Sequence, residues 1–283
     1  MKSKIIQDLE NKSLIIKTNL LNLATKESIH IGGDLSSADI MTVLWQYKIK
    51  YNIEDPKDEN RDRFILSKGH ASALLNFEQS MLGCFKEELV YSEYAKDGGM
   101  FAMHACDLKN PYVEVSTGSL GHGLPIACGI AMGLKLKQNK KNYVYVLMGD
   151  GEQSEGSVWE AAMNAVKYKL GNLVVFIDNN NLEADGSIND ITSLGDIGNK
   201  YKAFGWNVIN INGNDIESIV NAVDNLPKSD SEIPTVVVAH TIKGCGVTFM
   251  ENNVRWHAGK ISQEQYDMAI SSLQNKGGAN NEW

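Results

Sequence analysis

The sequence predicts an α/β protein with a doubly wound, mainly parallel sheet that carries helices on both faces. One observation is a set of apolar runs rich in Val, Ile and Leu, at residues 143–148, 173–177, 207–211 and 235–239. Such runs are typical of parallel strands buried on both faces. The other observation is that helix-length segments separate the runs, which indicates βαβ units. In such a sheet, ligands bind at the carboxyl ends of the strands.

Length and composition allow a large core and exclude several kinds of partner. The chain has 283 residues, 43% of them hydrophobic, and a formal net charge of -8. We expect a single domain over residues 1–283. Nucleic acid and anionic membranes are poor partners because they demand clustered Lys and Arg, and the chain has no basic run. No segment approaches the roughly eighteen apolar residues of a membrane span, and no signal peptide is recognisable, so we expect a cytoplasmic protein.

Helices are expected before and between the strands. Apolar residues at roughly helical spacing predict an N-terminal helix within residues 1–30. A second helix is expected to start at Ser36 or Ser37, where a hydroxyl can cap the first turn. The tail 275–283 has little to bury and is expected to be frayed. Further helices are expected over residues 123–138, 157–169, 196–204 and 215–225.

Oxygen ligands follow two neighbouring runs of the predicted sheet. Asp150 stands between Gly149 and Gly151 after the first run, and Asn180 lies in a group of three asparagines after the second. A lone buried carboxylate costs several kcal/mol unless a cation or a hydrogen-bond donor meets it. If the two strands are neighbours, their ends present a carboxylate and an amide to one point, which suits Mg²⁺ or Ca²⁺. Either segment alone is also typical of a plain turn, and only the combination favours a metal site.

Several histidines lie in or beside loops of Gly, Ser or other small residues. Imidazole is the side chain best matched to moving protons near neutral pH. One such histidine alone more often has a structural role, but several together beside a metal pattern favour a catalytic site. The roles of His122 and His240 stay open, and a structural role is preferred for His240. The candidate catalytic residues are His30, His70, His104 and His257.

The order Gly-Asp-Gly, helix, strand and Asn-Asn resembles the thiamine diphosphate signature. More narrowly, the chain resembles the diphosphate-binding part of transketolases from roughly residue 15 to residue 260. The matching segments are DRFILSKGHASALL, VEVSTGSLGHGLPIACGIAMG, GDGEQSEGSVWEAA and HTIKGCGV. The resemblance implies a thiamine diphosphate-binding fold. It also implies transfer of a two-carbon ketol group from a ketose phosphate to an aldose, in the pentose phosphate pathway or related carbohydrate metabolism.

The resemblance also implies roles at matched positions. Asp150, Asn180 and the backbone carbonyl of Leu182 are expected to bind the metal, which bridges to the cofactor diphosphate. His70 and His257 match histidines that contact the diphosphate or the reacting centre. The implied cofactor-binding residues are His70, Gly118, Leu120, Gly149, Asp150, Gly151, Asn180, Leu182, Lys243 and His257.

Other matched positions keep two interpretations. His30 and His104 match histidines that hydrogen-bond sugar hydroxyls and relay protons. Lys243 is either a cation near the diphosphate or an exposed loop lysine. Glu155 and Glu160 match acids at the interface between two active sites, yet acids in the first turn also favour an ordinary helix.

A glutamate that faces the pyrimidine ring of the cofactor lies, in transketolases, in a second domain that follows this one. No second run of strands and helices precedes Trp283, so we expect a separate partner chain with the pyrimidine-binding and C-terminal domains, in an α2β2 assembly. The alternatives are an α-type subunit of a 2-oxo acid dehydrogenase, a 1-deoxyxylulose-phosphate synthase, or a non-catalytic relative. Ile31, Asn76 and the segment MHACDLKNPYVE depart from the family's pattern, which leaves the identity of the sugars open.

Overall fold

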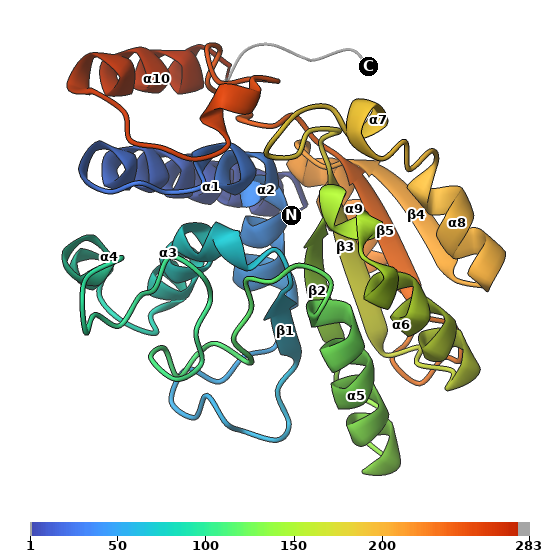
Figure 1. Ribbon diagram of the computed structural model, residues 1–283. Coiled ribbons are helices and arrows are strands. Elements are labelled where there is room, and N and C mark those ends of the chain that lie inside the picture. The colour runs from blue at the N-terminus through green and yellow to red at the C-terminus, as the bar shows by residue number, and fades with distance from the viewer. Residues whose placement is uncertain (1, 277–283) are drawn as a thin grey trace.

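One five-stranded parallel sheet organises the chain, as Figure 1 shows. The structure is a computed structural model that describes residues 2–276. The strands stand in the order β1-β2-β3-β5-β4, and every neighbouring pair is parallel. Helices pack on both faces, which confirms the predicted fold class. The strands are β1 Arg63–Leu66, β2 Val144–Gly149, β3 Leu173–Asn179, β4 Asn207–Asn212 and β5 Thr235–His240.

The apolar runs predict β2, β3, β4 and β5 to within two residues of their observed bounds. They do not predict β1. This strand is only four residues long and begins with Arg63, so its sequence has no periodic pattern of its own. It is a strand because it pairs along β2, where Phe64 lies beside Tyr145 and Leu66 beside Leu147. Its place at the edge of the sheet therefore depends on a tertiary contact.

Ten α-helices are described within residues 2–276. None of them is long and apolar enough to cross a membrane. The end of α10 includes residues 275 and 276, so that part of the tail is helical and not frayed; the remaining tail, 277–283, lies outside the described residues. The helices are α1 Lys2–Lys26, α2 Ile31–Val43, α3 Ser72–Leu82, α4 Glu87–Glu93, α5 Gly123–Leu136, α6 Gly156–Lys167, α7 Ile188–Ile191, α8 Ile197–Phe204, α9 Ile216–Asp224 and α10 Gln263–Lys276.

The start of α2 differs from the prediction, since the helix begins at Ile31 and not at Ser36 or Ser37. The two serine hydroxyls do not cap its first turn; both donate to the carbonyl of Gly33 inside the helix, at 3.1 and 2.7 Å. The earlier turn is possible because Gly32 has no side chain, and a Cβ there would lie 2.5 Å from the carbonyl oxygen of Trp256. Close packing against a distant segment therefore sets this boundary.

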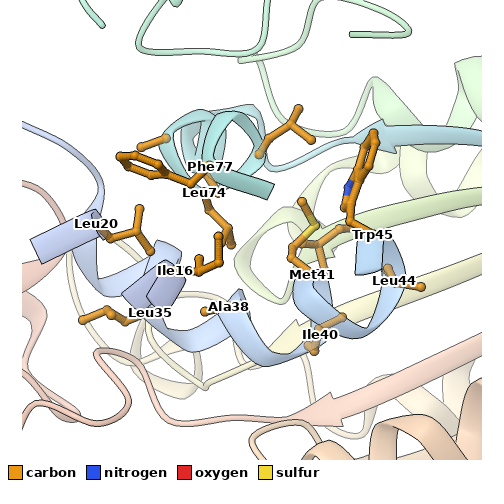
Figure 2. Close-up of a cluster of buried hydrophobic side chains, with 14 of the residues drawn as sticks. Ile16, Leu20, Leu35, Ala38, Ile40, Met41, Leu44, Trp45, Leu74 and Phe77 are labelled. Carbon is orange, nitrogen blue, oxygen red and sulfur yellow. The ribbon is translucent and has the colours of Figure 1, made fainter. Parts of the chain in front are cut away.

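Two apolar layers cover the sheet, and alternate residues of each strand belong to different layers. In β2, Tyr145 and Leu147 contact the layer of α1, α2, α3 and α9, while Val146 and Met148 contact the layer of α5, α6 and α8. Figure 2 shows the first layer, where side chains of α1, α2 and α3 interdigitate. Each fully buried aliphatic side chain contributes about 1.5–3 kcal/mol. The layers hold the strands rigidly, so their carboxyl ends keep fixed positions.

The register of the central strands brings three polar strand ends to one edge. Gly149 at the end of β2 pairs with Asp178 near the end of β3. Asn179 of β3 pairs in turn with His240, the last residue of β5. The β2 and β3 ends are therefore neighbours, as the prediction of a shared metal site requires.

Candidate active site

A pocket of about 390 Å³ opens at the carboxyl edge of the sheet. It is bounded by the ends of β2 and β3, the start of α2, the loop before α3, and the loops that follow β3 and β5. Every catalytic and cofactor-binding residue predicted from the sequence lines it. These residues are His30, His70, His104, Gly118, Leu120, Gly149, Asp150, Gly151, Asn180, Leu182, Lys243 and His257.

Asp150 is held at the tip of β2 by backbone donors. Its carboxylate accepts hydrogen bonds from the backbone N–H groups of Gly151, at 2.8 Å, and Asn181, at 2.5 Å. The side chain is only 2% exposed. Burial, followed by the nearby charge of Asp178, raises the pKa of Asp150 to about 7. Asp150 is thus a buried acid that lacks a strong counter-charge. A bound divalent cation would supply that counter-charge.

The loop after β3 points two further oxygens into the same pocket. The side-chain amide of Asn180 donates to Asp178 at 3.2 Å, while its oxygen accepts from the N–H of Leu182 at 3.1 Å. Asn181 has a φ of 62°, a left-handed conformation that asparagine adopts more readily than most residues. This turn carries the chain from Asn180 to Leu182. The carboxylate, the amide oxygen and the Leu182 carbonyl therefore line one cavity.

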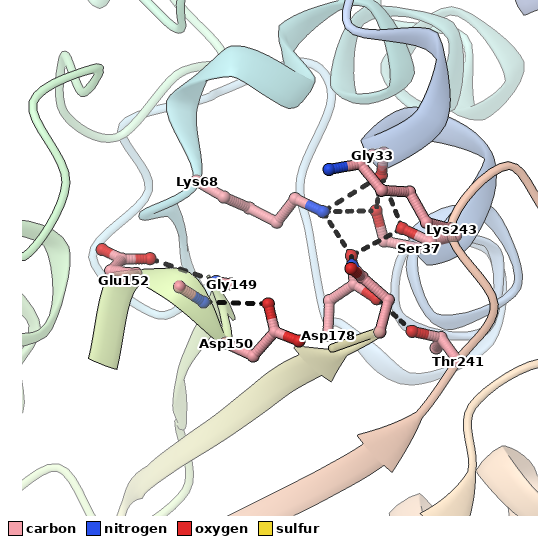
Figure 3. A network of polar contacts seen from close by, with 12 residues as sticks. Gly33, Ser37, Lys68, Gly149, Asp150, Glu152, Asp178, Thr241 and Lys243 are labelled. Atoms are coloured by element: carbon pink, nitrogen blue, oxygen red, sulfur yellow. Dashed lines mark hydrogen bonds and ion pairs between the residues drawn. The ribbon is translucent and has the colours of Figure 1, made fainter. Parts of the chain in front are cut away.

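A buried ion pair beneath these groups was not predicted from the sequence. Lys68 and Asp178 are 2% and 0% exposed, and their side chains contact each other directly (Figure 3). Asp178 also accepts from the hydroxyls of Ser36, at 2.6 Å, and Thr241. The Lys68 ammonium donates to the Gly33 carbonyl at 3.0 Å. Through this network Asp178 fixes the amide of Asn180 and ties β3 to α2.

Lys243 lies inside the pocket wall, so the interpretation as an exposed loop lysine is wrong. The side chain is 2% exposed. Its ammonium lies 3.1 Å from the carbonyl oxygen of Leu182, 3.0 Å from that of Glu183 and 3.1 Å from Nδ1 of His257. Burial, followed by repulsion from Lys68, lowers the pKa of Lys243 to about 8. This lysine therefore fastens the loop after β3 to the loop after β5.

Four histidines face one another across the opposite wall. The ring of His30 lies 5.1 Å from that of His70, 5.6 Å from that of His104 and 5.5 Å from that of His257, between centroids. Burial lowers the pKa of His30 and of His257 to about 4, and that of His70 well below its usual value. These three imidazoles are therefore neutral proton acceptors at pH 7.

Glycines allow close approach around the histidines. A Cβ at Gly69 would lie 2.5 Å from the hydroxyl of Thr117, and one at Gly118 would lie 3.2 Å from the ring of His104. The loop that carries His104 is held there because the N–H of Ala105 donates to the Gly69 carbonyl at 3.1 Å. These contacts explain why the predicted loop residues converge on the pocket.

A second buried acid, Glu152, was also missed by the sequence analysis. Its carboxylate accepts from the N–H groups of Gly121, at 2.8 Å, and Gly149, at 3.1 Å, and from the hydroxyl of Ser67. Burial raises its pKa. The only signal in the sequence was an acid two residues after Asp150. Glu152 ties the turn after β2 to the loop that carries Leu120.

The remaining candidates lie outside or at the rim of the pocket. Glu155 is exposed at the rim, whereas Glu160 and His122 line a separate groove between α5 and α6. His240 lies elsewhere, with its ring nitrogens 3.1 Å from the amide nitrogen of Asn179 and 3.2 Å from the oxygen of Asn210. These contacts account for His240 as a side chain that links strand ends.

No group of three or more His, Cys, Asp or Glu side chains is arranged to hold a metal within residues 2–276. A metal in the pocket would therefore need oxygens of other kinds as ligands. The amide of Asn180 and the carbonyl of Leu182, beside Asp150, supply them. This donor set is of the hard type that suits Mg²⁺, Ca²⁺ or Mn²⁺.

The parallel sheet and the polar pocket at its carboxyl edge define an α/β protein with a ligand-binding site at the strand ends. The chain belongs to the transketolase family, because the family model described as "Transketolase, thiamine diphosphate binding domain" matches residues 13–281. This confirms the family that the sequence motifs indicated.

Two named proteins are similar to this chain over nearly their whole length. The chain is 37% identical to a protein of Phocaeicola vulgatus named as one subunit of an apulose-4-phosphate transketolase, over 95% of this chain and 94% of that protein. It is 33% identical to the 6-deoxy-6-sulfo-D-fructose transketolase subunit SqwG of a Clostridium species, over 95% of this chain and 98% of that one.

Solved structures agree with this assignment. The transketolase of Leishmania mexicana superposes with a TM-score of 0.85 at 28% identity, and that of Campylobacter jejuni with 0.84 at 29%. The superpositions cover 95% and 96% of this chain but only 41% and 43% of those proteins. The chain thus spans less than half the length of these solved transketolases.

Proposed function

We propose that the chain is the thiamine diphosphate- and Mg²⁺-binding subunit of a two-component, cytoplasmic transketolase. It would transfer a two-carbon ketol group from a ketose phosphate to an aldose acceptor. The observation that carries the proposal is that Asp150, Asn180 and the Leu182 carbonyl line one pocket with four histidines. One side of the pocket has the oxygens that a metal needs and a lysine that attracts a diphosphate, and the other has imidazoles that can hydrogen-bond a sugar.

The residues present fit the cofactor and its metal. Asp150 is a buried acid in need of a cation, and a Cβ at the adjacent Gly149 would meet nothing within 4 Å. This free space suits a bulky group beside the acid. Lys243 and the helix that follows the turn add positive potential for a diphosphate. His30 lines the same pocket, and its buried Nδ1 has no hydrogen-bond partner among the described residues.

Roles follow from the position of each group. Asp150, Asn180 and Leu182 would hold the metal, and His70 and His257 lie close enough to Lys243 and the strand tips to contact the diphosphate. When bound, thiamine diphosphate supplies the nucleophilic carbon that accepts the two-carbon group.

The other two histidines suit the sugar. Neutral His30 lines the pocket and would take up the proton of a sugar hydroxyl and return it later. His104 is exposed at the mouth of the pocket and would hydrogen-bond the sugar. Gly118 and Leu120 would contact the cofactor from the same side as His104.

A partner chain with the pyrimidine-binding domain completes the proposal. Two relatives that match along nearly their whole length are named as single subunits of apulose-4-phosphate transketolases, which supports a second chain. The groove between α5 and α6, with Glu160 beside it and Met163 52% exposed, is a surface suited to contact within an α2β2 assembly. No observation favours the 2-oxo acid dehydrogenase alternative, and membership of the transketolase family favours ketol transfer.

Calorimetry with thiamine diphosphate and Mg²⁺ tests the cofactor assignment, with and without the partner chain. Asp150→Ala removes a charged ligand and should weaken binding by about a hundredfold or more. Equal affinity in the wild type and this variant would contradict the ligand assignment. Ketol transfer should require both chains, and robust turnover by this chain alone would contradict the two-component proposal.

A further inference from the structure

Lys243 occupies an unusual position for a lysine beside a divalent-metal site. Its ammonium lies 3.1 Å from the Leu182 carbonyl oxygen, the backbone oxygen that the proposed function assigns to the metal. It also lies 3.0 Å from the carbonyl oxygen of the next residue, Glu183. The loop that is proposed to bind the metal ion therefore already holds one positive charge, that of the Lys243 ammonium.

The hydrogen-bond partners of Lys243 can accommodate a charged ammonium. Besides the two carbonyls, Nδ1 of His257 lies 3.1 Å from Nζ. Carbonyls only accept, and with Nδ1 as a third acceptor all three N–H bonds of an ammonium are used. Each carbonyl oxygen has two lone pairs, so Leu182 can accept from Lys243 and still face a metal.

Among the described residues, two cationic side chains of Lys or Arg type line the pocket, and they have different partners. Lys68 is paired with the carboxylate of Asp178 at the floor. No salt bridge involving Lys243 is found within residues 2–276, and its hydrogen-bond partners there are two carbonyls and an imidazole. Its positive charge is therefore the less fully compensated of the two.

We propose that the ammonium of Lys243 is a built-in counter-cation of the loop that follows β3. It holds the carbonyls of Leu182 and Glu183 in place, and it makes binding of the metal depend on the diphosphate. The proposal rests on the proposed cofactor site. A bare divalent ion at Leu182 meets the ammonium across a shared carbonyl oxygen, and the two positive charges repel each other. A diphosphate places negative charge between them, and the same ammonium then attracts the ligand.

Lys243→Met separates these two effects because they have opposite signs. Binding of Mn²⁺ alone, followed by the loss of its free electron paramagnetic resonance signal, should tighten roughly tenfold in the variant, since one nearby positive charge is removed. Binding of inorganic pyrophosphate in the presence of Mg²⁺, measured by calorimetry, should weaken by roughly tenfold for the same reason. A variant that simply folds poorly would lose both.

Two further variants control the experiment. Lys243→Gln keeps hydrogen-bond donors but removes the charge, so it should tighten Mn²⁺ binding as Met does. It should also protect the amides of residues 180–187 from hydrogen exchange better than Met does. Lys202→Met removes an exposed lysine of α8 and should change neither affinity.

The outcomes separate the inference from the proposed function. Unchanged or weaker Mn²⁺ binding in both Lys243 variants would overturn the counter-cation role, even where the wild type binds thiamine diphosphate and Mg²⁺. Failure of the wild type to bind them would instead overturn the proposed function. Tighter binding of Mn²⁺ together with weaker binding of pyrophosphate would support the inference.

Discussion

Two buried acids lie behind the two walls of the pocket and are held in opposite ways. Behind the wall made by the strand ends, Asp178 is fully buried and accepts from Ser36, Thr241, Asn180 and the ammonium of Lys68. Behind the wall made by α2 and the histidine loops, Asp34 is equally buried, but neither carboxyl oxygen has a hydrogen-bond partner among the described residues.

The difference shows which wall is organised before a ligand arrives. At the strand ends, backbone N–H groups and buried side chains hold Asp150 and Asp178 in place, so the oxygens proposed to bind the metal are positioned by the fold itself. At the histidine wall, burial keeps His30 neutral and leaves its Nδ1 unpaired among the described residues. The first wall is suited to binding, and the second to reaction with what is bound.

His30→Ala should give the largest effect and separates the walls most clearly. Loss of a positioned acid–base group typically slows turnover by about 10²- to 10⁴-fold. Affinity for thiamine diphosphate and Mg²⁺ should stay within about threefold, because the strand-end oxygens are untouched. Kinetics and calorimetry on the enzyme assembled with its partner measure the two quantities. His240→Ala, outside the pocket, is the control and should alter neither turnover nor cofactor affinity. If His30→Ala lost as much cofactor affinity as turnover, the two walls would not differ in function.

Asp178→Asn should have the next largest effect, and it acts on stability. The substitution leaves the Lys68 ammonium buried without its carboxylate, which typically costs about 3–5 kcal/mol. Urea denaturation measures the loss.

The exposed pair of Lys12 and Asp8, at 2.9 Å, provides the matched control for Asp178→Asn. Asp8→Asn should cost about 0.5 kcal/mol or less. Similar costs for the two variants would mean that the buried pair does not organise the strand-end wall.

The strand-end wall is also the part of the site that the sequence predicts best. Asp150 and Asn180 each follow a strong apolar run, and parallel pairing brings such residues to one edge without any further information. The pairing of Lys68 with Asp178 was not predictable, because it joins residues 110 positions apart and no local pattern records such a contact. The burial of Lys243 likewise depends on how the loop after β3 folds over it.

The other features that the sequence did not predict are a strand and a helix start whose positions depend on packing. The strand β1 needs β2 beside it, and the early start of α2 needs Gly32 against the carbonyl of Trp256. Neither contact can be inferred from local hydrophobic patterns or capping residues. The four pocket histidines were found through their loops, but the low pKa values of His30, His70 and His257 follow from burial, which only the folded chain shows.

Asp34→Asn tests the second acid, and here the same substitution should stabilise the protein. Burial raises the pKa of Asp34 from 3.8 to about 8, although the charge of Lys68 and the backbone of Leu74 partly oppose the shift. The folded state therefore binds the proton more tightly than the unfolded state. The stability that Asp34 contributes is fully present below pH 3.8 and is lost as the pH rises toward about 8.

Asparagine has no proton to lose over this range, so the Asp34→Asn variant escapes that loss. Its advantage over the wild type in urea denaturation should be smallest at pH 4 and grow by several kcal/mol by pH 8. Asp178→Asn should destabilise at both pH values, because its effect comes from an unpaired lysine. An Asp34→Asn difference that does not change with pH would mean that Asp34 is paired as well as Asp178 is, and the two walls would then not differ in how they hold their acids.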